Sequence, residues 1–169
     1  MSENQVHIVI MDKKYIPTDE QVEKVESFLE AAVPFCEYDG VTVSETLRLV
    51  GSDFEIITCP KCQTSHNRFD KDIEELLASK LYNTNPETEE INLPCCNENT
   101  IVSELQLGED GAFTRFHYLA NEPAGHPDYW EDKNSEEDSM PYGTNMTNKA
   151  LEEISNILGS PVRVFWERI

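Results

Sequence analysis

The sequence has few basic residues and no long hydrophobic run. Thirteen Lys and Arg residues stand against 33 Asp and Glu residues, giving the 169-residue chain a formal net charge of −20. A surface of that sign repels phosphate backbones, which argues against nucleic-acid binding. The longest early apolar run, His7–Met11, is too short for a signal peptide or a membrane span, and residues 1–5 contain no basic residue. We therefore expect a soluble, cytoplasmic protein.

Several catalytic motifs are also missing. The sequence contains no Gly-rich phosphate loop, and it places no nucleophile and base at a diagnostic spacing. The zinc deaminase pattern, His-x-Glu followed by Pro-Cys-x-x-Cys, is absent, because the one histidine before the first cysteine pair is His7, which Ile8 and Val9 follow. The excess of negative charge favours either solubility alone or a basic protein partner.

The pattern of apolar residues predicts an α+β fold. The length suits one domain, or one domain with a small insertion. Thr18 and Gln21 have the spacing of a capping box at the start of a helix, and Asp70 is placed to begin a second one. Outside the cysteine-containing stretch the order is strand, helix, strand, twice over; the strands are expected at 7–11, 40–46, 112–119 and 162–166, and the helices at 19–32 and 147–158.

This order is that of a ferredoxin-like split βαβ sheet-and-helix layer. We expect residues 1–53 and 108–169 to form the α+β core. Residues 54–107 would then be an inserted zinc-ribbon-like subdomain, with short strands near 54–58 and 91–93.

Four of the five cysteines lie in this insertion, as Cys59-Pro60-Lys61-Cys62 and as Pro94-Cys95-Cys96. Two close cysteine pairs in a chain without a secretory signal are typical of a structural zinc site, and Cys59, Cys62, Cys95 and Cys96 are the expected ligands of Zn²⁺. Four thiolates close the coordination shell and leave no position for a catalytic water.

The ligand set has one open alternative. Consecutive side chains in an extended segment point in opposite directions, so Cys95 and Cys96 can both ligate only if the backbone turns sharply between them. His66, four residues after Cys62, is the alternative fourth ligand. A redox role for the first pair would need it at a helix N-terminus, whereas the next predicted helix begins only near Asp70.

Residues 121–146 are predicted to form a long acidic surface loop in which two aromatic residues, Tyr129 and Trp130, are adjacent. Loops of this length are usually functional or disordered. Aromatic residues in an acidic segment are typical of a protein-binding hot spot, but they can equally fold back and cover the sheet. The candidate partner-binding residues are Tyr129, Trp130, Glu131, Asp132, Glu136, Glu137 and Asp138.

Four segments of the chain form a recognisable combination: Phe54–Cys62, Leu93–Cys96, Phe113–Phe116 and Pro161–Trp166. In these segments the chain resembles an uncharacterised family of small acidic bacterial proteins with a zinc-ribbon-like insertion. The resemblance implies a glycine after the second cysteine of each knuckle, where this chain has Gln63 and Asn97. It implies no activity.

Taken together, the sequence predicts a non-enzymatic, zinc-stabilised interaction module that binds a basic partner protein. One concrete version is an immunity protein that neutralises a bacterial toxin. The alternative is a small metal-dependent hydrolase in which an incomplete thiolate set is completed by His66 or His117.

Overall fold

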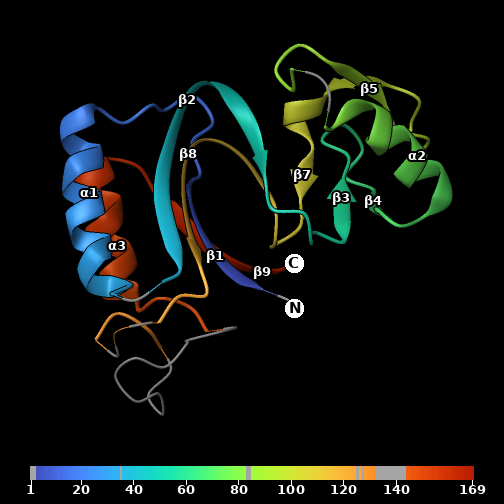
Figure 1. The fold of residues 1–169 in the computed structure, drawn as a ribbon. Helices are drawn as coiled ribbons and strands as arrows, with labels where there is room; N and C mark the ends of the chain where they lie inside the picture. Colours follow the sequence, from blue (N-terminus) through green and yellow to red (C-terminus); the bar gives the residue numbers. More distant parts are fainter. Residues whose placement is uncertain (1–2, 35, 83–84, 125, 127, 132–143) are drawn as a thin grey trace. The chain divides into compact units, whose positions relative to one another are not determined.

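The computed structural model describes residues 3–34, 36–82, 85–124, 126, 128–131 and 144–169 (Figure 1). Within these residues the fold is mixed α+β, with three α-helices and antiparallel sheets. The chain divides into two compact units. Unit 1 comprises residues 1–45 and 114–169, and unit 2 comprises residues 46–113. None of the described helices has the length and apolar character of a membrane span.

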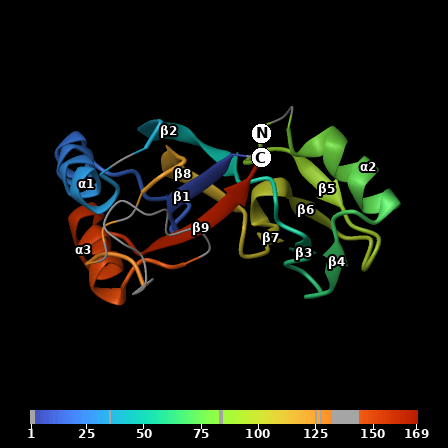
Figure 2. The same cartoon turned by 60° about the horizontal axis from the view of Figure 1, so that its bottom comes forward.

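Unit 1 is built on a four-stranded sheet with two helices on one face (Figure 2). The strand order is β2-β8-β1-β9, and β1 is antiparallel to both of its neighbours. Strands β2 and β8 each continue past the boundary between the units. The elements are β1 (Asn4–Ile10), α1 (Asp19–Ala32), β2 (Tyr38–Val50), β8 (Ala112–Asn121), α3 (Asn148–Leu158) and β9 (Val162–Arg168).

Alternation along β1 separates the two faces of this sheet. Val6, Ile8 and Ile10 are buried in the core cluster that also contains Val25 of α1 and Ile154 of α3. Successive side chains of a strand point to opposite faces. The residues between them, including His7, therefore lie on the face away from the helices.

Local sequence signals explain where the two helices of unit 1 begin and end. The Thr18 side chain accepts a hydrogen bond from the Gln21 N–H, and the Gln21 side-chain oxygen accepts one from the Thr18 backbone N–H, so the predicted capping box is confirmed. At the start of α3 the Thr147 side chain accepts a hydrogen bond from the Ala150 N–H, a single N-cap bond without the reciprocal one. Gly159 ends α3 in the left-handed conformation, with a φ of 74°.

Unit 2 contains short strands and one helix around its own core. A three-stranded sheet has the order β4-β3-β7, and β5 pairs with β6. Its core cluster includes Phe54, Ile57, Ile73, Leu77 and Leu93. The elements are β3 (Ile56–Thr58), β4 (Ser65–Asn67), α2 (Lys71–Lys80), β5 (Glu90–Asn92), β6 (Asn99–Ile101), a 3₁₀ turn (Val102–Glu104) and β7 (Gln106–Leu107).

Three details of unit 2 differ from the sequence-based prediction. The strand expected from residue 54 begins at Ile56, and Phe54 is fully buried ahead of it. Asp70 occupies the N-cap position of α2, but its side chain makes no capping hydrogen bond. β4 was not expected, because a strand of three polar residues carries no apolar signal.

Candidate metal centre

The first cysteine pair lies in the tight turn that joins β3 to β4. The Cys59 N–H donates to the Thr64 carbonyl at 2.9 Å, and the Gln63 N–H donates to the Cys59 carbonyl at 2.9 Å. Gln63 has a φ of 61°, in the left-handed region where glycine is most easily accommodated. These bonds fold the backbone around Cys59 and Cys62.

The second pair lies in the turn between β5 and β6. The Asn97 N–H donates to the Leu93 carbonyl at 3.3 Å, and Asn97 has a φ of 55°. The Asn92 side-chain amide donates to the Asn97 carbonyl at 3.0 Å and ties the turn to β5. The turn itself consists of Pro94, Cys95 and Cys96. The backbone therefore turns at the two adjacent cysteines, which is the condition for both thiols to bind one ion.

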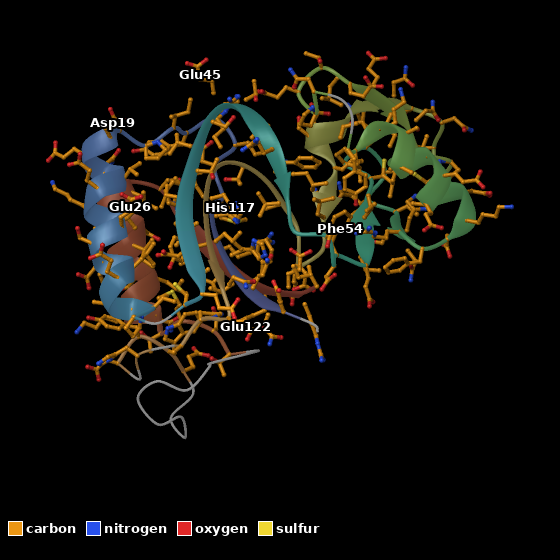
Figure 3. All side chains as sticks on the ribbon, in the orientation of Figure 1. Asp19, Glu26, Glu45, Phe54, His117 and Glu122 are labelled. Carbon is orange, nitrogen blue, oxygen red and sulfur yellow. The ribbon has the colours of Figure 1, made fainter. Side chains whose placement is uncertain are left out.

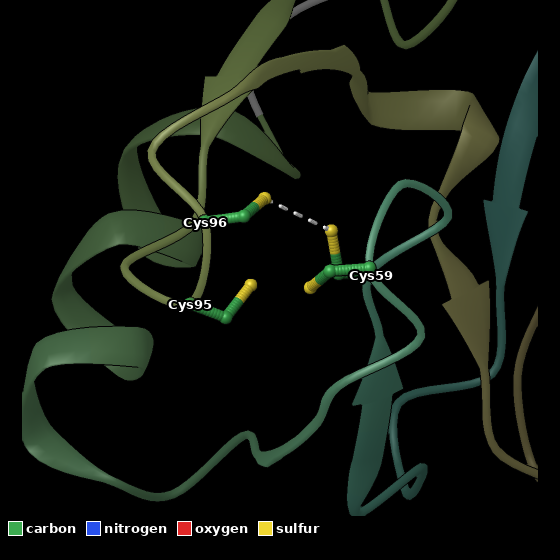
Figure 4. Close-up of side chains that lie close together, drawn as sticks. Cys59, Cys95 and Cys96 are labelled. Atoms are coloured by element: carbon green, nitrogen blue, oxygen red, sulfur yellow. Dashed lines mark hydrogen bonds between the residues drawn. The ribbon is translucent and has the colours of Figure 1, made fainter.

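The two turns bring four sulfur atoms together. The Sγ atoms of Cys59, Cys62, Cys95 and Cys96 all lie within 4.8 Å of one another, and those of Cys59 and Cys96 are 3.9 Å apart. Figure 4 shows the side chains of Cys95 and Cys96 both directed toward Cys59. Tetrahedral coordination with Zn–S bonds of 2.3 Å requires sulfurs about 3.8 Å apart. The donor set therefore suits a metal ion that prefers four thiolates.

His66 does not belong to this group. It lies in β4 and pairs with Ile57 across the three-stranded sheet. His117, the other histidine considered for the hydrolase, lies in β8 of unit 1.

The four thiols have unequal environments. Cys59 is 1% exposed, Cys95 and Cys96 are half-buried, and Cys62 is exposed. Thr64 lies beside Cys62, its hydroxyl oxygen 3.3 Å from Sγ, and hydrogen bonds from the Thr64 side chain and backbone lower the pKa of the Cys62 thiol to about 6. Desolvation, and then the neighbouring thiol of Cys62, raise the pKa of Cys95 to about 12. Of Cys62 and Cys95, Cys62 is therefore the thiol that is more easily deprotonated.

No family model, curated protein or solved structure matches this chain. The cysteine centre is therefore interpreted from its own chemistry. A tetrahedral set of four sulfurs is typical of zinc or of an iron–sulfur centre. If all four sulfurs bound one ion, its tetrahedral shell would be filled by protein donors, with no open coordination position.

The predicted partner-binding residues have different locations. Trp130 is 1% exposed, its indole N–H donates to the Ala32 carbonyl at 2.9 Å, and its ring lies 5.7 Å from that of Trp166. The expectation that Trp130 is exposed is therefore wrong. The alternative, in which the aromatic side chain folds back, describes Trp130. Tyr129 is half-buried with its ring edge-on to Phe28, and Glu131 is exposed. Asp132, Glu136, Glu137 and Asp138 lie outside the described residues.

Three residues that shape the site were not among its predicted members. Gln63 and Asn97 were noted only as departures from a glycine, and Thr64 was not singled out. Both Gln63 and Asn97 immediately follow the second cysteine of a pair and have a positive φ. The position after each pair is the signal that would have identified them, because a left-handed residue there reverses the chain.

Proposed function

We propose that Cys59, Cys62, Cys95 and Cys96 bind one structural Zn²⁺, which holds together the two turns of a zinc-ribbon-like subdomain. The observation that carries this proposal is the convergence of four sulfurs within 4.8 Å. Four thiolates are a common ligand set for structural zinc. The ion would link turns that are 32 residues apart in the sequence.

We further propose that this subdomain is inserted into a ferredoxin-like core. The support is the strand order β2-β8-β1-β9, with β1 and β8 adjacent and antiparallel at the centre. Helix α1 connects β1 to β2, and helix α3 connects β8 to β9, so each connection passes over one neighbouring strand. This strand order and these connections support the proposed split βαβ arrangement.

The function proposed for the whole chain is a cytoplasmic interaction module that binds a basic protein. The net charge of −20 favours such a partner through electrostatic steering. Helix α1 offers a concrete surface, because Asp19, Glu23, Glu26 and Glu30 are exposed at helical spacing (Figure 3). An immunity protein that neutralises a basic bacterial toxin is one version. A reducing compartment suits the four thiolates.

The metal proposal is tested by metal analysis and X-ray absorption at the zinc edge. The expected result is one zinc per chain with four sulfur neighbours at about 2.3 Å. Cys95→Ser and Cys96→Ser should each reduce the zinc content, whereas the control Cys36→Ser should not, because Cys36 lies outside the sulfur group. A mixed shell of sulfur with nitrogen or oxygen, together with a bound water, would support the metal-dependent hydrolase instead.

The partner proposal is tested by capture from a cell lysate at low and at physiological salt. The wild-type protein should retain a basic protein, and the variant Glu23→Gln/Glu26→Gln/Glu30→Gln should retain it less. The control Asp72→Asn/Glu74→Gln/Glu75→Gln removes the same number of exposed carboxylates from α2 and should leave retention unchanged. If no basic protein is recovered under either salt condition, the proposed function is wrong.

A further inference from the structure

Three ionisable side chains form a linked chain on the face of the unit 1 sheet away from its helices. His7 Nδ1 lies 2.9 Å from His117 Nε2, and His7 Nε2 lies 3.0 Å from Glu167 Oε2. His7 is 3% exposed and Glu167 is 6% exposed. The three residues come from β1, β8 and β9, which are adjacent in the sheet. The chain is separate from the cysteine centre, and the proposed function does not use it.

The two imidazole rings are placed for a direct nitrogen-to-nitrogen hydrogen bond. Their planes differ by 11° and their centroids are 5.1 Å apart, so the rings meet edge to edge and nearly in one plane. The Phe165 ring is stacked on the His7 ring, with centroids 4.9 Å apart and planes 12° apart. Phe165 therefore restricts rotation of the His7 ring, so that each of its two nitrogens keeps its own neighbour.

The geometry limits the number of protons that the pair can hold. One proton lies between His7 Nδ1 and His117 Nε2. The pair can take up a first additional proton and keep this hydrogen bond, because His7 Nε2 or His117 Nδ1 can carry the added proton. The Glu167 carboxylate also favours a positive charge on His7, although it lies off the direction of a hydrogen bond from Nε2. A second additional proton would make two N–H donors and two positive charges face each other across 2.9 Å.

We propose that Glu167, His7 and His117 form a pH-sensitive latch that holds β8 and β9 to β1 and weakens in mild acid. An unfolded chain binds a proton on each histidine below about pH 6.5. The folded pair binds only one. Because the unfolded state then binds more protons, folding stability decreases as the pH falls through this range.

The other charged groups on this face support the same direction. Arg115 of β8 and Arg163 of β9 share the face; the Arg115 Nε–H donates to the Lys13 carbonyl at 2.9 Å, and the Arg163 guanidinium lies 5.4 Å from the Phe165 ring centre. The positive charges of both guanidinium groups oppose the binding of a second additional proton by the histidine pair. Glu37 comes close to this face farther along the strands, where its carboxylate accepts a hydrogen bond from the Asn121 side-chain amide at 3.3 Å. On β2, Val41 packs against the core, so Gly40, Thr42 and Ser44 occupy the latch face and cannot titrate in this range.

Tryptophan fluorescence measures the effect in unit 1 alone, because both tryptophans, Trp130 and Trp166, belong to it. The unfolding constant would be measured in urea between pH 7.5 and 5.5. In the wild-type protein the latch should increase the unfolding constant by as much as tenfold for each pH unit below about pH 6, which corresponds to one proton. His117→Gln should lose this excess slope, because one remaining histidine has no partner to compete with. The control His126→Gln, a histidine of the same unit outside the latch, should keep it.

Nuclear magnetic resonance of the four histidines gives a second readout that needs no variant. Between pH 8 and 5, His7 and His117 together should take up one proton. Glu167→Gln should reduce even that first uptake. The proposal is overturned if His7 and His117 each take up a full proton in the folded protein, or if wild type and His117→Gln show the same slope.

Discussion

Trp130 gives the sharpest test of how the segment after β8 is held. Its indole is buried in the unit 1 core and its N–H bonds to the carbonyl of Ala32, the last residue of α1. The final carbonyls of a helix have no partner inside the helix. The Ala32 carbonyl also accepts from the His126 N–H at 3.2 Å. Trp130 therefore fills the core and helps to cap α1 at the same time.

Two substitutions separate these contributions. Trp130→Ala removes the ring and should lower the free energy of unfolding by about 3–5 kcal/mol. Trp130→Phe keeps much of the ring but removes the donor. Because His126 still bonds to Ala32, the carbonyl is not left without a partner. The lost hydrogen bond then accounts for about 0.5–1.5 kcal/mol, to which the smaller ring volume adds.

Urea unfolding followed by circular dichroism and by the fluorescence of Trp166 provides the measurement. Ile16→Ala is the control, because Ile16 is an apolar side chain of the same unit that is 45% exposed. Its effect should stay within about 0.5 kcal/mol. If Trp130→Ala destabilises the protein no more than Ile16→Ala does, then Trp130 is not a core residue, and its role as a partner-binding aromatic would be restored.

Three further predictions concern single positions. Gly111→Ala should destabilise unit 2 by about 1–3 kcal/mol in urea unfolding, because a Cβ would lie 2.6 Å from the buried Phe54 ring; Gly40→Ala, with no atom within 4 Å, should not. Burial, and then a neighbouring carboxylate, raise the pKa of Tyr118 above its ordinary value, so the unfolded state loses this proton first and stability should fall above about pH 10; Tyr118→Phe should remove that loss in alkaline unfolding curves. Thr18→Ala should lower the midpoint of thermal unfolding through loss of about 1 kcal/mol of capping.

Helix ends were predictable from the sequence because their signals are local. Thr18 and Gln21 are three residues apart and cap α1 with their own side chains. Thr147 and Gly159 likewise mark α3 without help from distant residues. The strands of unit 1 were also recognisable, since alternating or continuous apolar residues are local patterns.

The cysteine centre was predictable in its members but not in its geometry. The spacing of the two pairs singled out four thiols as candidates. Whether Cys95 and Cys96 could point the same way depended on the backbone turn between β5 and β6, and a positive φ at Asn97 helps to close it. Asparagine tolerates that conformation but does not require it, so the residue type alone left the question open.

Contacts between distant segments could not be predicted. Trp130 is 98 residues from the carbonyl to which it bonds, and its acidic neighbours in the sequence favoured a surface position. The His7–His117 pair depends on the register of β1 against β8, in which Val9 lies opposite His117. A shift of one residue would have moved these side chains to the other face, and nothing local fixes that register.

The pairing of Trp130 with Met146 has a practical consequence for protein engineering. The two residues form an antiparallel bridge, and the Glu131 N–H donates to the Asn145 carbonyl at 2.9 Å. These contacts join positions on either side of residues 132–143, and one of the bridged side chains, the Trp130 indole, is buried. A crosslinking residue for isolating a binding partner is therefore better placed at the exposed Glu131 than at the buried Trp130 or Met146, and both termini remain unmodified.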